Sequence, residues 1–139
     1  MNYGYVTNEL AVEMATNICN CIGHGKYETA VHMIIETAVA ETGLGKIEDK
    51  TDAAGMGITQ FDKIPFADVR NRCIKLKPQI EKDLGVDITK VDWDDLRYNI
   101  FLSLLFARLL YWLKGEPIPK TIEERAAYWK LHYNTPLGK

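Results

Sequence analysis

Apolar residues in the first third of the chain recur at steps of three and four, the spacing that lines one face of an α-helix. This pattern predicts a first helix over residues 9–21, with Asn8 as its N-cap and Gly23 after its end. A second helix is predicted over residues 28–41, before Gly43. The expected buried stripes consist of Leu10, Met14, Ile18 and Cys21 in the first helix and of Val31, Ile34, Ile35, Ala38 and Val39 in the second.

A polar stretch that contains several glycines separates these two helices from the rest of the chain. Residues 46–57 are predicted to form an irregular loop or a small two-stranded flap. Helices are predicted over residues 65–75 and 78–84, each beginning at a proline, which is tolerated in the first turn. The most apolar stretch, residues 96–113, is predicted to be a central buried helix, and a capping-box pattern predicts a last helix over residues 121–133.

The composition is that of one globular domain. The chain has 139 residues, of which 47% are apolar and 26% are charged, and no repeat, low-complexity segment or linker divides it. A chain of this length can bury one core without metals or disulfides. We therefore expect residues 1–139 to form a single, mainly α domain with a central buried helix and a small irregular or β flap.

Charge and cysteine content argue against several classes of protein. The formal net charge of −2 disfavours nucleic acid as a partner, because phosphate binding needs a cationic surface. The three cysteines give no disulfide framework. Cys19, Cys21 and His24 are close in sequence, yet no second Cys/His pair follows them, so no metal site is expected.

The N-terminal residues 1–10 lack a basic region followed by an apolar run, so no signal peptide is expected. The apolar stretch over residues 100–113 includes Arg108 and is too short to span a bilayer. The sequence therefore predicts a soluble protein without a membrane partner, which needs another route if it acts outside the cytoplasm.

Glu41 is the first candidate for chemistry. It ends an apolar helix, and a carboxyl group beside apolar packing loses solvation, which raises its pKa. A raised pKa keeps the proton on the carboxyl near neutral pH, as a general acid requires. The alternative is a glutamate solvated at a helix end, since a negative charge there costs only ~0.3–1 kcal/mol.

Two later segments contain residue types suited to binding sugars. Gly57 lets the backbone approach a ligand, and the amide of Gln60 needs a partner if it is buried. The aromatic and amide side chains within residues 128–135 are of the kinds that pack on sugar faces and bond hydroxyl and acetamido groups. Taken alone, the first segment also fits a simple glycine turn, and the second fits a helix whose aromatic residues belong to the core.

Taken in order, these elements resemble the motifs of the lytic transglycosylases of the soluble-lytic, goose-lysozyme-like group, over residues 31–138. Glu41-Thr42 is similar to the Glu-Ser that ends the family's first apolar helix. Gly57-Ile58-Thr59-Gln60 is similar to the family's Gly-Leu-Met-Gln turn. Asn99-Ile100 is similar to the Asn-Ile that opens its long helix. Tyr133-Asn134, with Gly138 shortly after, is similar to its Tyr-Asn motif. The departures are Thr42 for Ser, Ser103 and Phe106 where Gly and Tyr are usual, and Thr135-Pro136-Leu137 in place of Ala-Gly-Pro.

The resemblance implies a lysozyme-like fold with a cleft, and cleavage of the β-1,4 bond between N-acetylmuramic acid (MurNAc) and N-acetylglucosamine (GlcNAc) in peptidoglycan. It implies that Glu41 is the sole catalytic carboxyl, which protonates the glycosidic oxygen and then takes the proton of the muramoyl 6-hydroxyl. The product is a 1,6-anhydro sugar, and no metal or cofactor takes part. The implied substrate-binding residues are Thr42, Gly57, Gln60, Tyr133 and Asn134, of which Gln60 and Tyr133 position the glutamate and the sugar.

Three alternatives stay open at the level of sequence. A hydrolytic muramidase, or endolysin, would use water and a second carboxylate, for which Asp49, Asp52 and Asp62 are the candidates. Glu36 is a rival of Glu41, although its place five residues earlier points it to another side of the helix. A non-catalytic wall-binding or virion structural module would keep the same fold.

A wall substrate together with no expected signal peptide fits a bacteriophage protein. Such a protein would act on peptidoglycan glycan strands at the bacterial cell wall or in the periplasm. It would reach them in the virion or by release through a holin.

Overall fold

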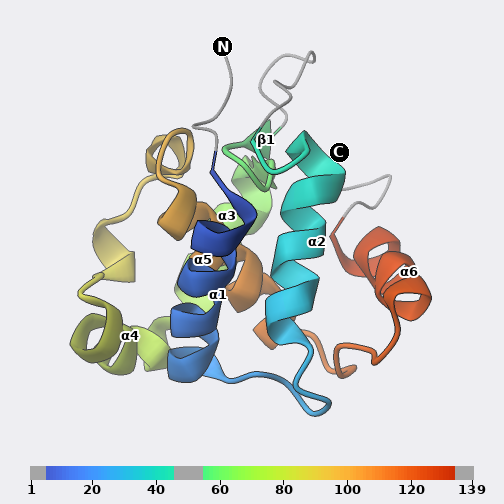
Figure 1. The fold of residues 1–139 in the computed structure, drawn as a ribbon. Coiled ribbons are helices and arrows are strands. Elements are labelled where there is room, and N and C mark those ends of the chain that lie inside the picture. Colours follow the sequence, from blue (N-terminus) through green and yellow to red (C-terminus); the bar gives the residue numbers. More distant parts are fainter. Residues whose placement is uncertain (1–5, 46–54, 134–139) are drawn as a thin grey trace.

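The computed structural model describes residues 6–45 and 55–133, and within these ranges the chain is mainly helical, as predicted (Figure 1). The α-helices are α1 (Asn8–Ile22), α2 (Ala30–Thr42), α3 (Lys63–Arg72), α4 (Lys77–Leu84), α5 (Ile100–Trp112) and α6 (Ile122–His132). Short 3₁₀ turns are η1 (Ile74–Leu76), η2 (Ile88–Lys90) and η3 (Trp93–Leu96). Strands β1 (Gly55–Met56) and β2 (Phe61–Asp62) form one small antiparallel hairpin.

Helix α5 is the centre of the molecule, which confirms the prediction of a central buried helix. Every residue from Leu102 to Tyr111 is buried, and α1, α2 and α3 pack around it. The helix begins at Ile100 and not at residue 96, because the side chain of Asn99 accepts a hydrogen bond from the Leu102 backbone N–H at 3.0 Å. The preceding residues form the separate turn η3, which has its own capping box.

The buried faces of α1 and α2 differ from the predicted stripes. In α1 the buried positions include the small residues Ala11 and Ala15, whereas Leu10 is 44% exposed. In α2 the buried positions include Thr37, whereas Val39 is 51% exposed. Small side chains let helices approach closely, so small residues share the buried faces with large ones such as Ile18 and Ile34, while Leu10 and Val39 lie outside them.

The predicted helix starts are off by one to four residues, for local reasons. Thr7 and not Asn8 caps α1, because the Thr7 hydroxyl accepts from the Leu10 N–H at 3.2 Å. Helix α2 starts after Glu28, whose positive φ of 59° is incompatible with a helix. Its end follows the prediction, since Gly43 adopts the left-handed conformation with φ 59°. Helix α3 begins at Lys63, so Pro65 lies within its first turn instead of starting it.

The hairpin lies at the C-terminal end of α2 (Figure 1). Its tight turn contains Gly57 with φ 77° and Gln60 with φ 49°. A Cβ at Gly57 would lie 2.1 Å from the Leu96 carbonyl oxygen and 2.4 Å from the Ser103 hydroxyl oxygen, so only glycine fits there. The hairpin overlaps only the end of the predicted flap, since residues 46–54 lie outside the described ranges.

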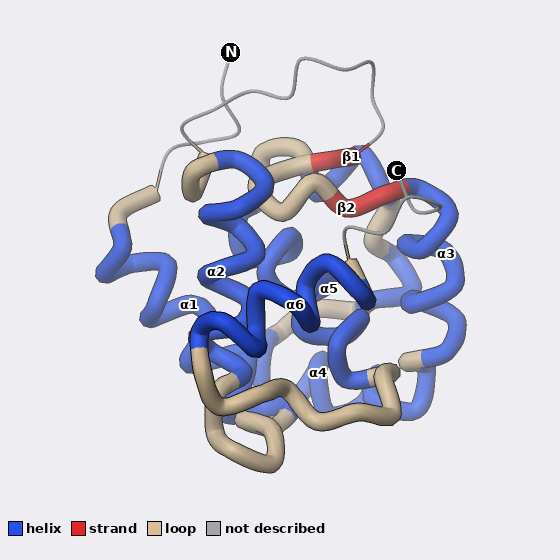
Figure 2. Tube along the Cα trace, turned by 90° about the vertical axis from the view of Figure 1, so that its right-hand side faces the viewer, coloured by secondary structure: helices blue, strands red, loops and turns tan. Residues whose placement is uncertain are grey.

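Helix α6 lies at the surface beside α2, as the two views in Figures 1 and 2 agree. The Thr121 hydroxyl caps its start by accepting from the Glu124 N–H at 3.2 Å, as the capping-box pattern predicted. None of the described helices is long and apolar enough to cross a membrane.

Candidate active site

The C-terminal end of α2 is tied to the hairpin turn through Thr42. Its buried hydroxyl donates to the Ile58 carbonyl oxygen at 2.6 Å and accepts from the Gly45 N–H at 2.9 Å. Glu41, the residue before it, is half-buried at the same end of the helix. The Glu-Thr pair therefore places a carboxyl group at the rim of the turn and uses the hydroxyl to hold the two segments together.

Three residues of α6 and its end face α2 and the turn at four-residue steps, which is one side of a helix. Arg125 donates to both carboxylate oxygens of Glu36, at 2.7 and 2.9 Å. The Trp129 indole N–H donates to Oε2 of Glu41 at 3.1 Å. The Tyr133 hydroxyl donates to the Thr59 carbonyl oxygen at 2.6 Å. This side of α6 thus brings Glu41, the turn and Tyr133 into one region.

The two phenols closest to this region are buried and neutral. Burial raises the pKa of Tyr133 well above its ordinary value; the bond to Thr59 opposes the rise, and the charges of Tyr111, Glu41 and Asp62 add to it. Burial likewise raises the pKa of Tyr111, opposed by its bond to Thr37, with Glu41 adding to the rise. Tyr133 therefore acts here as a hydrogen-bond donor and not as a phenolate, and both rings lie within electrostatic reach of Glu41.

The amide of Gln60 closes its own turn. The side chain is 4% exposed, and its Nε2 donates to the Gly57 carbonyl oxygen at 3.0 Å. Gln60 therefore stabilises the turn that Thr42 and Tyr133 contact. That Gln60 and Gly57 bind substrate stays a prediction.

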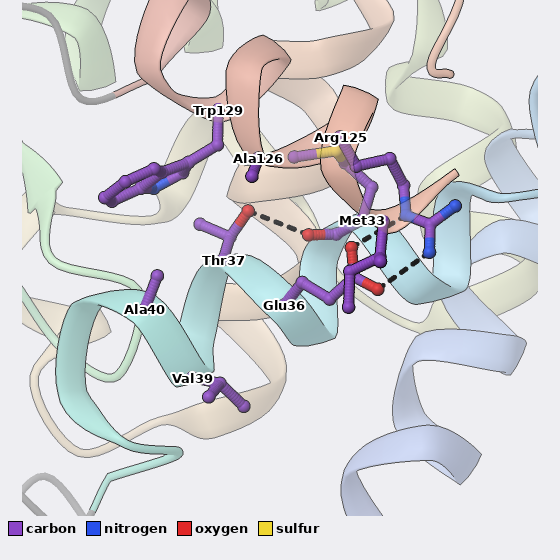
Figure 3. Close-up of a pocket in the computed structure, with 9 residues that line it drawn as sticks. Met33, Glu36, Thr37, Val39, Ala40, Arg125, Ala126 and Trp129 are labelled. Atoms are coloured by element: carbon purple, nitrogen blue, oxygen red, sulfur yellow. Dashed lines mark hydrogen bonds and ion pairs between the residues drawn. The ribbon is translucent and has the colours of Figure 1, made fainter. Parts of the chain in front are cut away.

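A pocket of about 310 Å³ lies between α2 and α6, and the surface that lines it is almost wholly apolar. Its lining residues are Met33, Glu36, Thr37, Val39, Ala40, Ile122, Arg125, Ala126 and Trp129. Figure 3 shows the Glu36–Arg125 pair at one part of this lining and the Trp129 ring at another. Because Trp129 also bonds Glu41, the indole connects the cavity with the candidate carboxyl.

Glu36 and Glu41 have different hydrogen-bond partners. Glu36 is held in a two-pronged pair with Arg125, whose side chain is 8% exposed and also donates to the Lys120 carbonyl oxygen at 2.6 Å. A geometry of this kind fixes both groups. Glu36 thus anchors α6, and Glu41 is the carboxyl beside the turn.

Of the other predicted carboxylates and Asn134, the structure describes only Asp62. Asp62 is half-buried at the end of β2, and its charge acts on Tyr133. Asp49, Asp52 and Asn134 lie outside the described residues.

Sequence reasoning missed Arg125 and the Thr59 carbonyl oxygen. It interpreted Trp129 as a core or sugar-packing residue and not as a partner of Glu41. The available signal was the four-residue step that leads from Tyr133 back to Trp129 and Arg125.

The residues weighed as metal ligands have separate partners. Cys21 Sγ donates to the Gln79 carbonyl oxygen at 3.7 Å, and His24 Nε2 bonds Asn20 Oδ1 at 2.8 Å. Burial raises the pKa of the Cys19 thiol, although the nearby Arg108 guanidinium opposes the rise. Within the described ranges, no three His, Cys, Asp or Glu side chains come together as metal ligands would.

Comparisons with known proteins found no relative of this chain. No protein-family model matches the chain, and neither a curated protein nor a solved structure does.

Proposed function

We propose that this chain is a peptidoglycan lytic transglycosylase that cleaves the MurNAc–GlcNAc β-1,4 bond with Glu41 as its single catalytic carboxyl. One observation carries the proposal. Motif residues far apart in sequence meet in one region: Thr42 bonds the turn at Ile58, and Tyr133 bonds the same turn at Thr59. Glu41 lies beside them, and its charge acts on Tyr133.

The proposed reaction needs two proton transfers at one carboxyl. Glu41 gives its proton to the glycosidic oxygen as the bond from that oxygen to C1 of MurNAc breaks, and GlcNAc leaves with a 4-hydroxyl. The muramoyl O6 then bonds C1, and its proton returns to Glu41, so no water is consumed.

A hydrolytic muramidase is the second candidate, favoured by the position of Asp62. Its charge acts on Tyr133, as the charge of Glu41 does, so both carboxyl groups lie near one phenol. In that reaction water replaces the 6-hydroxyl, and a second carboxylate activates the water or stabilises the sugar cation.

The deciding experiment is turbidity clearing of purified cell walls, combined with mass spectrometry of the released muropeptides. Glu41→Gln should lower the clearing rate by ~100-fold or more, as loss of a general acid does. Glu13→Gln, at an exposed position of α1, is the matched control and should clear at the wild-type rate. Anhydro ends support the transglycosylase.

Three other outcomes contradict the proposal. New reducing ends that disappear in Asp62→Asn indicate the muramidase. Unchanged clearing by Glu41→Gln removes Glu41 from the catalytic role. A wild-type protein that binds walls without clearing them is a wall-binding module.

Delivery by a virion or through a holin is a separate prediction, which lysis of cells with and without a co-expressed holin tests.

A further inference from the structure

In the hydrogen bond between Trp129 and Glu41, the indole is the donor and the carboxyl is the acceptor. An indole N–H can donate a hydrogen bond but cannot accept one. Oε2 of Glu41, 3.1 Å from the indole nitrogen, must therefore be the accepting oxygen in both protonation states of the carboxyl. The bond is stronger when the carboxyl is ionised, because an ionised acceptor makes a shorter and stronger hydrogen bond than a neutral one.

The indole is held in place from both sides along α6. One turn earlier, Arg125 is bonded to Glu36, and just past the helix end Tyr133 is bonded to the Thr59 carbonyl oxygen. The ring itself borders the apolar cavity between the two helices (Figure 3). Rotation of the ring into solvent would expose its apolar surface and break the bond to Glu41, so the donor stays aimed at the carboxyl.

We propose that Trp129 is the positioning residue of Glu41: it holds the carboxyl by Oε2 and stabilises the ionised form. The catalytic consequence rests on the proposed function, whereas the pairing itself does not. In the transglycosylase reaction the carboxyl alternates between acid and base. A donor that favours the carboxylate assists departure of the first proton, and a carboxyl held in one orientation is presented in the same way to the glycosidic oxygen and to the 6-hydroxyl.

Other titratable groups face this pair and must be distinguished from it. Among the described residues they include Glu36 on α2, Arg125 on α6, Tyr133 just past α6, Tyr111 on α5 and Asp62 on β2. A pH response of Trp129 that survives Glu41→Gln would come from one of these groups.

The indole N–H gives a direct readout that does not depend on activity. The chain has three tryptophans, so ¹⁵N-tryptophan labelling gives three indole signals, and Trp129→Phe identifies one of them by its loss. We expect the Trp129 signal to shift with pH in the wild type and to stay constant in Glu41→Gln. A constant Trp129 signal in the wild type, or an unchanged titration in Glu41→Gln, overturns the inference even if Trp129→Phe fails to fold.

Trp93→Phe is the matched control for activity. Its indole N–H also donates a hydrogen bond, at 2.7 Å, but to the Phe61 carbonyl oxygen. We expect Trp129→Phe to lower kcat by about tenfold and to move the alkaline limb of the pH–rate profile, where Glu41 loses its proton, to higher pH, because a charge-assisted bond to the carboxylate is lost. Trp93→Phe should leave the position of that limb unchanged. Equal profiles for wild type and Trp129→Phe overturn the positioning role.

The two proposals fail in different ways. A Trp129 signal that titrates with Glu41 in a protein that does not clear walls contradicts the proposed function alone. Clearing that depends on Glu41, together with a constant Trp129 signal and an unshifted alkaline limb in Trp129→Phe, contradicts the role of Trp129 alone.

Discussion

Helices α5 and α6 are held in the molecule by different forces. All residues of α5 from Leu102 to Tyr111 are buried, so the helix is fixed by the removal of apolar surface from water. Within α6 only Arg125 and Tyr128 are buried, and Ile122 and Leu131 are each 59% exposed. Helix α6 depends instead on hydrogen bonds and one ion pair, which act only in a narrow range of geometry. The contrast suggests that α5 determines stability and α6 determines the geometry of the site.

The largest expected effect tests α5. Leu105→Ala removes a side chain that is 0% exposed, and we expect a loss of ~2–5 kcal/mol in the free energy of unfolding. Leu131→Ala, the same substitution at a 59% exposed position of α6, should change it by less than ~0.5 kcal/mol. Urea unfolding measures both. Similar losses for the two variants would contradict the comparison.

The next effect tests the ion pair that anchors α6. Arg125→Met leaves Glu36 without its partner, and because the Glu36 side chain is 29% exposed, water moderates the loss to ~1–3 kcal/mol. Arg72→Met breaks the exposed pair with Asp68, whose side chains are 55% and 57% exposed, and should cost less than ~1 kcal/mol.

Wall clearing and amide hydrogen exchange show where the Arg125→Met effect lies. We expect clearing to fall, and exchange to accelerate in α6 while α5 stays protected. Loss of protection throughout α5 at the same time would show that the two helices unfold as one unit.

A smaller effect should distinguish the hydroxyl of Tyr133 from that of Tyr128. Tyr133→Phe removes the bond to the Thr59 carbonyl oxygen, and Tyr128→Phe removes a bond of 2.7 Å to the Glu116 carbonyl oxygen. Each should cost about 0.5–1.5 kcal/mol in unfolding free energy. Only Tyr133→Phe should slow wall clearing, since only Thr59 belongs to the turn beside Glu41. An equal loss of clearing in both variants would argue against the turn as part of the site.

The smallest effect is a pH dependence of α6. Burial lowers the pKa of His132, and the charge of Lys114 lowers it further, while Glu116 opposes both. The unfolded chain, with a histidine pKa of ~6.5, then binds the proton more readily than the folded one, so stability falls as pH drops below that value. His132→Gln should lose less stability than wild type between pH 7 and pH 5 in thermal unfolding. Parallel losses would show that His132 does not contribute.

Much of the helical framework followed from local chemistry in the sequence. The end of α2 at Gly43, the end of α4 at Gly85 and the cap of α6 at Thr121 depend on neighbouring residues alone. The start of α5 at Ile100 follows the Asn99-Ile100 motif rather than the apolar pattern, which extended the helix back to residue 96. Periodicity gives the length of an apolar stretch, whereas a single polar side chain determines where its first turn begins.

Local sequence patterns were sufficient to predict a mainly helical chain with a buried central helix and to put Glu41 at a helix end. The buried faces of α1 and α2 were settled by tertiary packing, because they depend on which neighbours pack against each helix. Tertiary packing also gave the two rival glutamates different partners. Their partners, Arg125 and Trp129, lie 89 and 88 residues away along the chain. No local pattern encodes pairs at that separation, since they form only when α6 folds back against α2.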